Sequence, residues 1–297
     1  MLVVCIGDGL GNQMFQYAFY CELKHKYPEN HVTADICNYY GSVNKHNGYE
    51  LERVFGIKLP ACDKRTASVL ADFTPHSSHK VLNKLFQARR ILFGNKESFI
   101  TQDDPTAYYP EVFELNRLKS YMFRGNWINE EYFCNCKEEL LKDFSFVQEA
   151  DEKNARLMEK LEKENAVSIH VRRGDYLQTN MQHLGREYYE KAVSIIREKV
   201  ENPLFYIFSD DSGYVRQEFD FIEEEQRVIV DWNKGTESYR DMQLMSCCKH
   251  NIIANSTFSF WGAYLNQHEY KLVIAPAVAS KGCRNPFACK GWMLLSN

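Results

Sequence analysis

The chain has 297 residues, of which 36 are Lys or Arg and 40 are Asp or Glu, so its formal net charge is −4; 44% of its residues are hydrophobic. This composition is typical of a globular protein, and an acidic balance without a basic stripe argues against a nucleic-acid-binding protein. No apolar run reaches the roughly 20 residues that span a bilayer, and the first residues lack the basic segment and cleavage site of a signal peptide.

The first third of the sequence begins with a predicted βαβ unit. Residues 2–6 are rich in valine and predict a buried strand, and glycines follow at positions 7, 9 and 11. Residues 12–26 predict a helix with Met14, Ala18 and Cys21 on its buried face and Glu22 toward solvent. Residues 31–37 predict the next strand. Between residues 40 and 130 we expect long connections, a basic helix over 80–92 and a strand that starts at Tyr121.

The second half of the sequence is more regular. A charged helix is expected over residues 151–163, and Thr236 is expected to cap a later helix. Strands are predicted over residues 166–171, 204–208, 227–230, 251–254 and 272–275, and helices over 186–200, 212–219 and 257–266. Alternating strands and helices indicate a parallel, doubly wound sheet, so the fold class is α/β. We expect two Rossmann-like domains, residues 1–155 and 156–297, facing a cleft.

The ten cysteines do not form a recognisable framework. They are scattered through predicted core elements, and there is no CxxC pair. We therefore expect reduced thiols that pack as small hydrophobic side chains in a cytoplasmic protein.

The glycine-rich loop Gly7-Asp8-Gly9-Leu10-Gly11-Asn12-Gln13 lies between the first strand and the first helix. Glycines let a backbone approach a ligand closely, and the start of a helix offers free N–H groups to an anion. The spacing is G-x-G-x-G, which differs from the dinucleotide fingerprint G-x-G-x-x-G and disfavours an NAD-binding enzyme. A tight turn without a ligand is the alternative.

The segment His170-Val171-Arg172-Arg173-Gly174-Asp175-Tyr176 ends a predicted buried strand. His170 and Arg172 alternate to the same side of the strand. Arginine is suited to a diphosphate because its planar fork donates bidentate hydrogen bonds. The alternative is a surface Arg–Asp pair of little energetic value.

Two further polar segments follow predicted strands. Asp210 and Asp211 come after the strand that ends at Phe208, where they would bind a metal, accept from ribose or a base edge, or cap the next helix. The absence of any Asp-x-Asp weakens the case for a metal-dependent enzyme. Asn255, Ser256 and Thr257 stand at the start of a helix, where hydroxyl groups form either a phosphate site or an ordinary cap.

Four blocks together resemble the α-1,2-fucosyltransferases of glycosyltransferase family 11. They are GLGNQMFQYA at 9–18, HVRRGDY at 170–176, FSDD at 208–211 and NSTFSFWGAYL at 255–265. The resemblance implies a GT-B-like fold, GDP-fucose as donor and a galactose-terminated glycan as acceptor. It also implies inversion at the anomeric carbon and no cofactor or metal. On this resemblance residues 1–155 form the mainly acceptor-side domain and residues 156–297 bind GDP-fucose.

The resemblance also implies roles for individual residues. Arg172, with Arg173 beside it, would contact the GDP phosphates, and His170 and Asp175 would lie near the donor. The remaining expected donor contacts are the glycine-loop residues Gly9 and Gly11, Asn12 and Gln13 near the transferred sugar, Asp210 or Asp211 at the nucleoside, and the Asn255, Ser256 and Thr257 segment at the pyrophosphate. Asp175 is the candidate base that accepts the proton of the acceptor hydroxyl, or else it orients Arg172.

Two other functions stay open at this point. One is a related glycosyltransferase that uses another linkage or nucleotide sugar. The other is a non-catalytic protein that binds a nucleotide sugar or a glycan. No nucleic-acid partner and no membrane span are expected, and peripheral association with a membrane remains an open alternative.

Overall fold

The computed structural model describes residues 1–36, 46–71, 80–94, 96–105, 107–174, 184–280, 283–286 and 288–296. The chain divides into two compact units, an N-terminal unit of Met1–Val147 and a C-terminal unit of Gln148–Asn297. The boundary predicted at residue 155 lies inside helix α6 (Glu152–Lys163), and this helix belongs entirely to the C-terminal unit.

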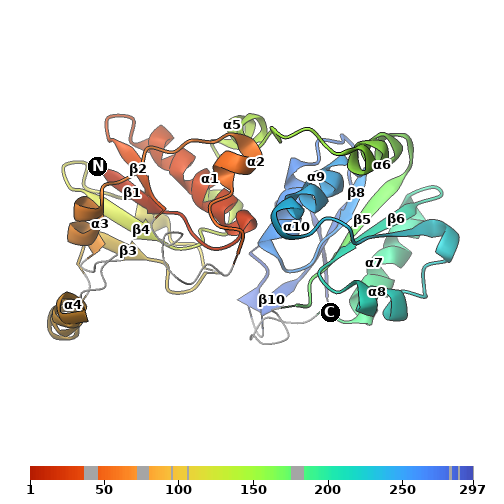
Figure 1. Ribbon diagram of the computed structural model, residues 1–297. Helices are drawn as coiled ribbons and strands as arrows, with labels where there is room; N and C mark the ends of the chain where they lie inside the picture. Colours follow the sequence, from red (N-terminus) through yellow and green to blue (C-terminus); the bar gives the residue numbers. More distant parts are fainter. Residues whose placement is uncertain are drawn as a thin grey trace. The chain divides into compact units, whose positions relative to one another are not determined.

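The N-terminal unit is built on a parallel sheet with the strand order β2-β1-β4-β3 (Figure 1). The strands are β1 (Leu2–Cys5), β2 (Val32–Asp35), β3 (Phe99–Thr101) and β4 (Tyr121–Arg124). The helices are α1 (Leu10–Lys26), α2 (Leu51–Phe55), α3 (Lys64–Ala71), α4 (Lys80–Phe93) and α5 (Lys137–Asp143). The predicted βαβ opening is confirmed, because β1 and β2 pair in parallel on either side of α1 in the sequence.

Helices α1 and α3 cover opposite faces of this sheet. Met122 of β4 packs in one cluster with Val3 and with Leu70 of α3. The next residue of β4, Phe123, points the other way and meets Phe19 of α1 edge-to-face at 5.4 Å between ring centroids. Large aromatic side chains therefore fix the helix on the sheet.

Glu22 of α1 does not face solvent, so that prediction was wrong. The side chain is completely buried. Its carboxylate accepts hydrogen bonds from the backbone N–H of Asn135 at 3.2 Å, from Asn135 Nδ2 at 2.6 Å and from Cys136 Sγ at 3.5 Å. Three donors compensate for burying this carboxylate.

The C-terminal unit holds a six-stranded sheet with the order β12-β9-β8-β5-β6-β7, and its described pairings are all parallel. Its strands are β5 (Ala166–Val171), β6 (Leu204–Ser209), β7 (Arg227–Val230), β8 (His250–Ile252), β9 (Val273–Pro276) and β12 (Met293–Leu295), and β10 (Val278–Ser280) pairs separately with β11 (Cys283–Arg284). Its remaining helices are α7 (Arg186–Lys199), α8 (Ser212–Glu218), α9 (Tyr239–Cys247) and α10 (Thr257–Leu265). The order is that of a Rossmann sheet, which confirms the predicted doubly wound α/β fold.

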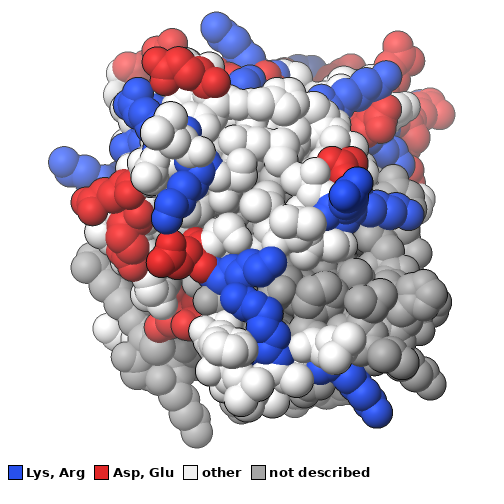
Figure 2. Space-filling view, turned by 90° about the vertical axis from the view of Figure 1, so that its left-hand side faces the viewer, with Lys and Arg blue, Asp and Glu red and all other residues white. Residues whose placement is uncertain are grey.

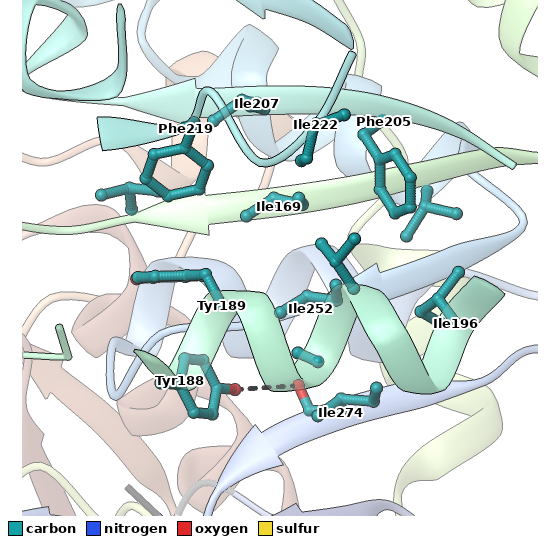
Figure 3. Close-up of a cluster of buried hydrophobic side chains, with 14 of the residues drawn as sticks. Ile169, Tyr188, Tyr189, Ile196, Phe205, Ile207, Phe219, Ile222, Ile252 and Ile274 are labelled. Carbon is teal, nitrogen blue, oxygen red and sulfur yellow. Dashed lines mark hydrogen bonds between the residues drawn. The ribbon is translucent and has the colours of Figure 1, made fainter. Parts of the chain in front are cut away.

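Helix α7 covers one face of the β5–β6 pair. Figure 3 shows Ile169 and Ile207 of the strands facing Tyr189 of α7, and Ile196 continues the same contact about two turns later. The hydroxyl of Tyr188 lies 2.8 Å from the carbonyl oxygen of Ile253 and 3.4 Å from that of Ile274, so a buried polar atom is satisfied at the edge of the cluster.

Other predictions can be compared directly with the structure. The strand at 166–171 and the strand at 227–230 have the predicted bounds. Thr236 does not cap α9, because it lies in the 3₁₀ turn Gly235–Glu237 and α9 begins at Tyr239. Eight cysteines whose side chains the structure describes are free thiols, as expected; the side chains of Cys37 and Cys283 lie outside the described part of the chain.

The described residues contain no helix that is both long and apolar enough to cross a membrane.

Candidate functional site

The strand order of the C-terminal unit places a topological switch point between β5 and β8. The chain runs outward from β5 through β6 to β7 and then returns to β8 on the other side of β5. Helix α7, which follows β5, packs against Ile169 and Val171, whereas His170 on the opposite side lies beside Phe258 of α10 at 5.8 Å between ring centroids. The two helices therefore lie on opposite faces, and ligands of such sheets bind outside the strand ends at this point.

The predicted arginines and aspartates meet at the carboxyl ends of β5 and β6. Nη1 of Arg172 lies 3.0 Å from Oδ2 of Asp210, and the backbone N–H of Arg173 donates to Oδ1 of the same carboxylate at 2.9 Å. Nε of Arg173 lies 3.3 Å from Oδ2 of Asp211. Adjacent strands in parallel register explain the meeting, because His170 and Val171 stand opposite Phe208 and Ser209.

The two arginines are held differently. The guanidinium of Arg173 stacks on the ring of Tyr214 at 3.6 Å from the centroid, and Asp211 also caps α8 by accepting from the N–H of Tyr214 at 3.0 Å. Arg173 is thus fixed against α8 by a cation–π contact and an ion pair. The side chain of Arg172 is 31% exposed and remains accessible to a ligand.

Gly174 passes close to the Asp210 carboxylate. A Cβ atom at this position would lie 2.8 Å from Oδ2 of Asp210, which is closer than a real Cβ contact allows. A side chain at residue 174 would therefore push this carboxylate away from its present position.

His170 is a buried, neutral imidazole. The side chain is 6% exposed, and burial, followed by the positive charge of Arg172, lowers its pKa to about 3. Within the described residues its Nδ1 atom has no hydrogen-bond partner. A buried polar atom without a partner at the end of a central strand is able to bond to a ligand.

The segment 255–257 opens helix α10. Ser256 is the N-cap, and its side chain accepts from the N–H of Phe258 at 3.3 Å. Asn255 and Ser256 are buried, while Thr257 is half-buried. The helix begins after β8, the neighbour of β5, and Arg172 directly follows β5, so helix N–H groups and an arginine flank the same switch point.

The glycine loop of the N-terminal unit lies at a second switch point, between β1 and β4. Gly9 is the N-cap of α1 and makes no side-chain bond, Gly11 is buried, and Asn12 is half-buried. Gln13 is completely buried: its Nε2 donates to the carbonyl oxygens of Asp8 and Gly48, both at 2.9 Å, and its Oε1 accepts from the N–H of Glu50 at 2.9 Å. Gln13 therefore holds the loop in position.

Gln16 supports the glycine loop, and the sequence analysis did not identify it. Its Oε1 accepts from the N–H of Gly7 at 2.8 Å, and its Nε2 donates to the carbonyl oxygen of Gly125 at 3.1 Å. Gln16 thus ties the loop after β1 to the loop after β4. The signal available in the sequence was a second glutamine three residues after Gln13 on a helix face that is otherwise apolar.

Asp175 lies outside the described residues. Metal-ligand side chains gather elsewhere in the described part of the chain, at His25, Cys136 and Glu139 and at Cys21, Glu139 and Asp143. These groups already bond to protein atoms: His25 Nε2 lies 2.7 Å from Glu139, and Asp143 accepts from Tyr17 at 2.6 Å. None of the predicted donor-site residues belongs to either group.

A parallel Rossmann sheet with arginines and a helix N-terminus at its switch point is the arrangement in which nucleotide-binding α/β proteins hold phosphate groups. The sequence model described as "Glycosyl transferase family 11" matches residues 1–293. The chain belongs to glycosyltransferase family 11 and is a glycosyltransferase, and each of its two units is an α/β fold on a parallel sheet, as expected from the sequence.

Curated relatives agree with this family. The chain is 29% identical to an Escherichia coli alpha-1,2-colitosyltransferase over 93% of this chain and 91% of the relative. It is 29% identical to the E. coli O-antigen biosynthesis glycosyltransferase WbnK over 92% of each chain. It is 26% identical to the rabbit (Oryctolagus cuniculus) galactoside alpha-(1,2)-fucosyltransferase 1 over 69% of this chain and 67% of the relative.

Similar solved structures include fucosyltransferases and heptosyltransferases. An α-1,6-fucosyltransferase NodZ soaked with GDP-fucose is 14% identical, covers 89% of this chain and 91% of its own, and has a TM-score of 0.47. The E. coli ADP-heptose LPS heptosyltransferase II is 12% identical, covers 99% of this chain and 89% of its own, and also has a TM-score of 0.47.

Proposed function

We propose that the protein transfers L-fucose from GDP-β-L-fucose to the 2-hydroxyl of a galactose residue in a surface polysaccharide or oligosaccharide, with inversion and without a metal ion. The observation that carries this proposal is that Arg172 and helix α10 follow β5 and β8, the two neighbouring strands that flank the switch point of the C-terminal sheet. Family membership and the α-1,2-specific relatives support it.

The proposed donor site follows from the charge that develops in the reaction. Cleavage of the sugar–phosphate bond leaves the negative charge on the diphosphate. In the absence of a metal, preorganised donors must stabilise this charge. Arg172 supplies a bidentate cation, and the first N–H groups of α10 with the Thr257 hydroxyl supply neutral donors.

Asp210 has a positioning role in this proposal. It holds the Nη1 atom of Arg172 and the N–H of Arg173 at the same carboxylate, so the guanidinium is oriented before the donor binds. Because the ion pair restricts the rotamers of Arg172, less conformational entropy is lost on binding.

The acceptor hydroxyl must lose a proton during transfer, and Asp175 remains the proposed base. His170 is the alternative near the same strand end. Its pKa of about 3 makes the imidazole a weak base at neutral pH, so we assign it a hydrogen-bonding role toward the donor.

The direct test is incubation with GDP-fucose and a panel of β-galactosides, with the linkage of the product determined by NMR. The proposal predicts fucose on O2 of galactose and undiminished transfer in excess EDTA. Transfer to another hydroxyl, or loss of transfer in EDTA, would contradict it. Asp175→Asn tests the base: activity within a few-fold of wild type would exclude that role.

A second candidate donor is GDP-colitose, because one similar relative is a colitosyltransferase. Colitose lacks the 3-hydroxyl of fucose. A site that hydrogen-bonds this hydroxyl would reject colitose strongly, whereas a site without such a bond would accept both sugars. The ratio of kcat/KM for the two donors decides between them. A cytoplasmic location is part of the proposal, and cell fractionation tests it.

A further inference from the structure

Helix α4 exposes large apolar side chains. Leu85 is 63% exposed, and the last three residues of the helix, Ile91, Leu92 and Phe93, are 78%, 73% and 76% exposed. Single exposed hydrophobic residues are common on soluble proteins. Four within one helix of 14 residues, three of them consecutive, form an apolar surface that needs a partner.

The same helix is strongly basic. Its sequence, KVLNKLFQARRILF, has four Lys or Arg residues and no Asp or Glu. Leu85, Leu92 and Phe93 follow the spacing i, i+7, i+8 and share one helix face. Arg89 also lies on this face, where its Nη1 is 3.5 Å from the carbonyl oxygen of Gly94, and Lys84 is exposed on a neighbouring face. Figure 2 looks onto this end of the N-terminal unit, where Lys and Arg side chains lie beside uncharged ones in the lower half of the view.

The apolar end of α4 is attached to the unit by the chain that follows it. Gly94 leaves the helix with a φ of +72°, in open space. Lys96 Nζ then donates to the carbonyl oxygen of Val69 at 2.7 Å and Ser98 Oγ to that of Leu70 at 2.9 Å, both on α3. These two bonds attach the chain shortly after the exposed end of α4 to α3.

We propose that α4 binds the surface of a membrane that contains anionic lipids. Leu85, Leu92 and Phe93 enter the boundary between headgroups and acyl chains, and Lys84 contacts the headgroup phosphates. An amphipathic helix that combines exposed apolar residues with cations and no acids is suited to an anionic lipid surface. A nucleic acid would bind the cations but leave Leu85, Leu92 and Phe93 exposed to water. This proposal does not depend on the donor or acceptor of the reaction.

The test is co-sedimentation of the full chain with vesicles of phosphatidylcholine alone or with added phosphatidylglycerol. We expect binding to the anionic vesicles that weakens as salt rises. The double substitution Leu92→Ser/Phe93→Ser should lower the partition coefficient by at least a factor of about ten. Lys84→Gln should lower it about fivefold at low salt.

Matched controls come from the same unit. Leu118 is 97% exposed but lies outside α4, and Lys58 is an exposed cation outside it. Leu118→Ser and Lys58→Gln should bind vesicles as the wild type does. Thermal unfolding and transfer to a soluble acceptor should be unchanged in Leu92→Ser/Phe93→Ser, which shows that the fold is intact.

Three results would overturn the proposal. The first is no binding to phosphatidylglycerol-containing vesicles. The second is equal loss of binding in Leu118→Ser and in Leu92→Ser/Phe93→Ser. The third is a dimer in light scattering that Leu92→Ser/Phe93→Ser dissociates, because a second copy of the chain would then cover the apolar face.

Discussion

Asp210 holds Arg172 and Arg173 together: its Oδ2 lies 3.0 Å from Nη1 of Arg172, and its Oδ1 accepts from the N–H of Arg173 at 2.9 Å. The contact joins the carboxyl ends of β5 and β6. It fixes the direction of the guanidinium that faces the proposed diphosphate.

Asp210→Asn should therefore weaken donor binding. An amide of the same size cannot accept from both partners, because one of its two polar atoms is a donor. We expect a rise of about tenfold in the KM for the donor with a smaller change in kcat. Tighter donor binding in this variant would contradict this role, because Asp210 would then only compete with the diphosphate for Arg172.

Gly174→Ala should reproduce this loss through sterics. The added Cβ would lie 2.8 Å from Oδ2 of Asp210 and displace the carboxylate from Arg172. Gly213→Ala is the control, because its Cβ would lie at an ordinary 3.6 Å from Asp211. In a double-mutant cycle the effects of Gly174→Ala and Asp210→Asn on the donor KM should be clearly non-additive. Full additivity would mean that Gly174→Ala does not act through Asp210.

Glu22→Ala should destabilise the N-terminal unit by about 3 kcal/mol. The substitution empties a completely buried position and removes the acceptor of Asn135 and of the buried Cys136 thiol. Lys24→Ala, two residues further along the same helix and exposed, should change the free energy of unfolding by less than about 0.5 kcal/mol. Urea denaturation measures both, and equal effects would contradict the assigned role of Glu22.

Asp241 should make stability fall as the pH rises. Burial raises its pKa from 3.8 to about 7, although Asn233 donates to it at 2.8 Å. Between these two values the folded state binds more protons than the unfolded state, so the free energy of unfolding decreases with pH up to about 7. Asp241→Asn should therefore raise stability at pH 8 by an amount on the order of 1 kcal/mol, and by less at pH 5.

Asp231 provides a control, because its pKa is shifted in the opposite direction to that of Asp241. A hydrogen bond from Arg216 is the main cause that lowers the pKa of Asp231, so this carboxylate stabilises the fold above its unfolded pKa and stops doing so in acid. Asp231→Asn should lower the thermal midpoint at pH 8. The same sign of change in both variants would contradict the assignment.

Local pattern predicted the regular elements well. The apolar run of β5 defined its bounds, since strands buried in a parallel sheet are nearly continuous hydrophobic segments. Contacts between distant segments were not predictable in this way. Glu22 has its partners at Asn135 and Cys136, and Gln16 has one at Gly125; these positions become neighbours only when β4 pairs beside β1.

In the candidate site, too, the positions of residues along the chain were predictable but their contacts were not. The sequence placed Arg172, Arg173 and Asp210 at strand ends, and parallel register brings adjacent strand ends together. It did not predict that Asp210 pairs with Arg172, because this depends on the close passage of Gly174.

The affinity of GDP for the wild type and for Arg172→Ala tests the central claim most directly. Isothermal titration calorimetry, with GMP as the comparison ligand, measures whether Arg172 recognises the diphosphate. The account predicts that the wild type binds GDP much more tightly than GMP, and that Arg172→Ala, with an unchanged thermal midpoint, loses most of this difference. A folded Arg172→Ala variant that binds GDP as tightly as the wild type would contradict it.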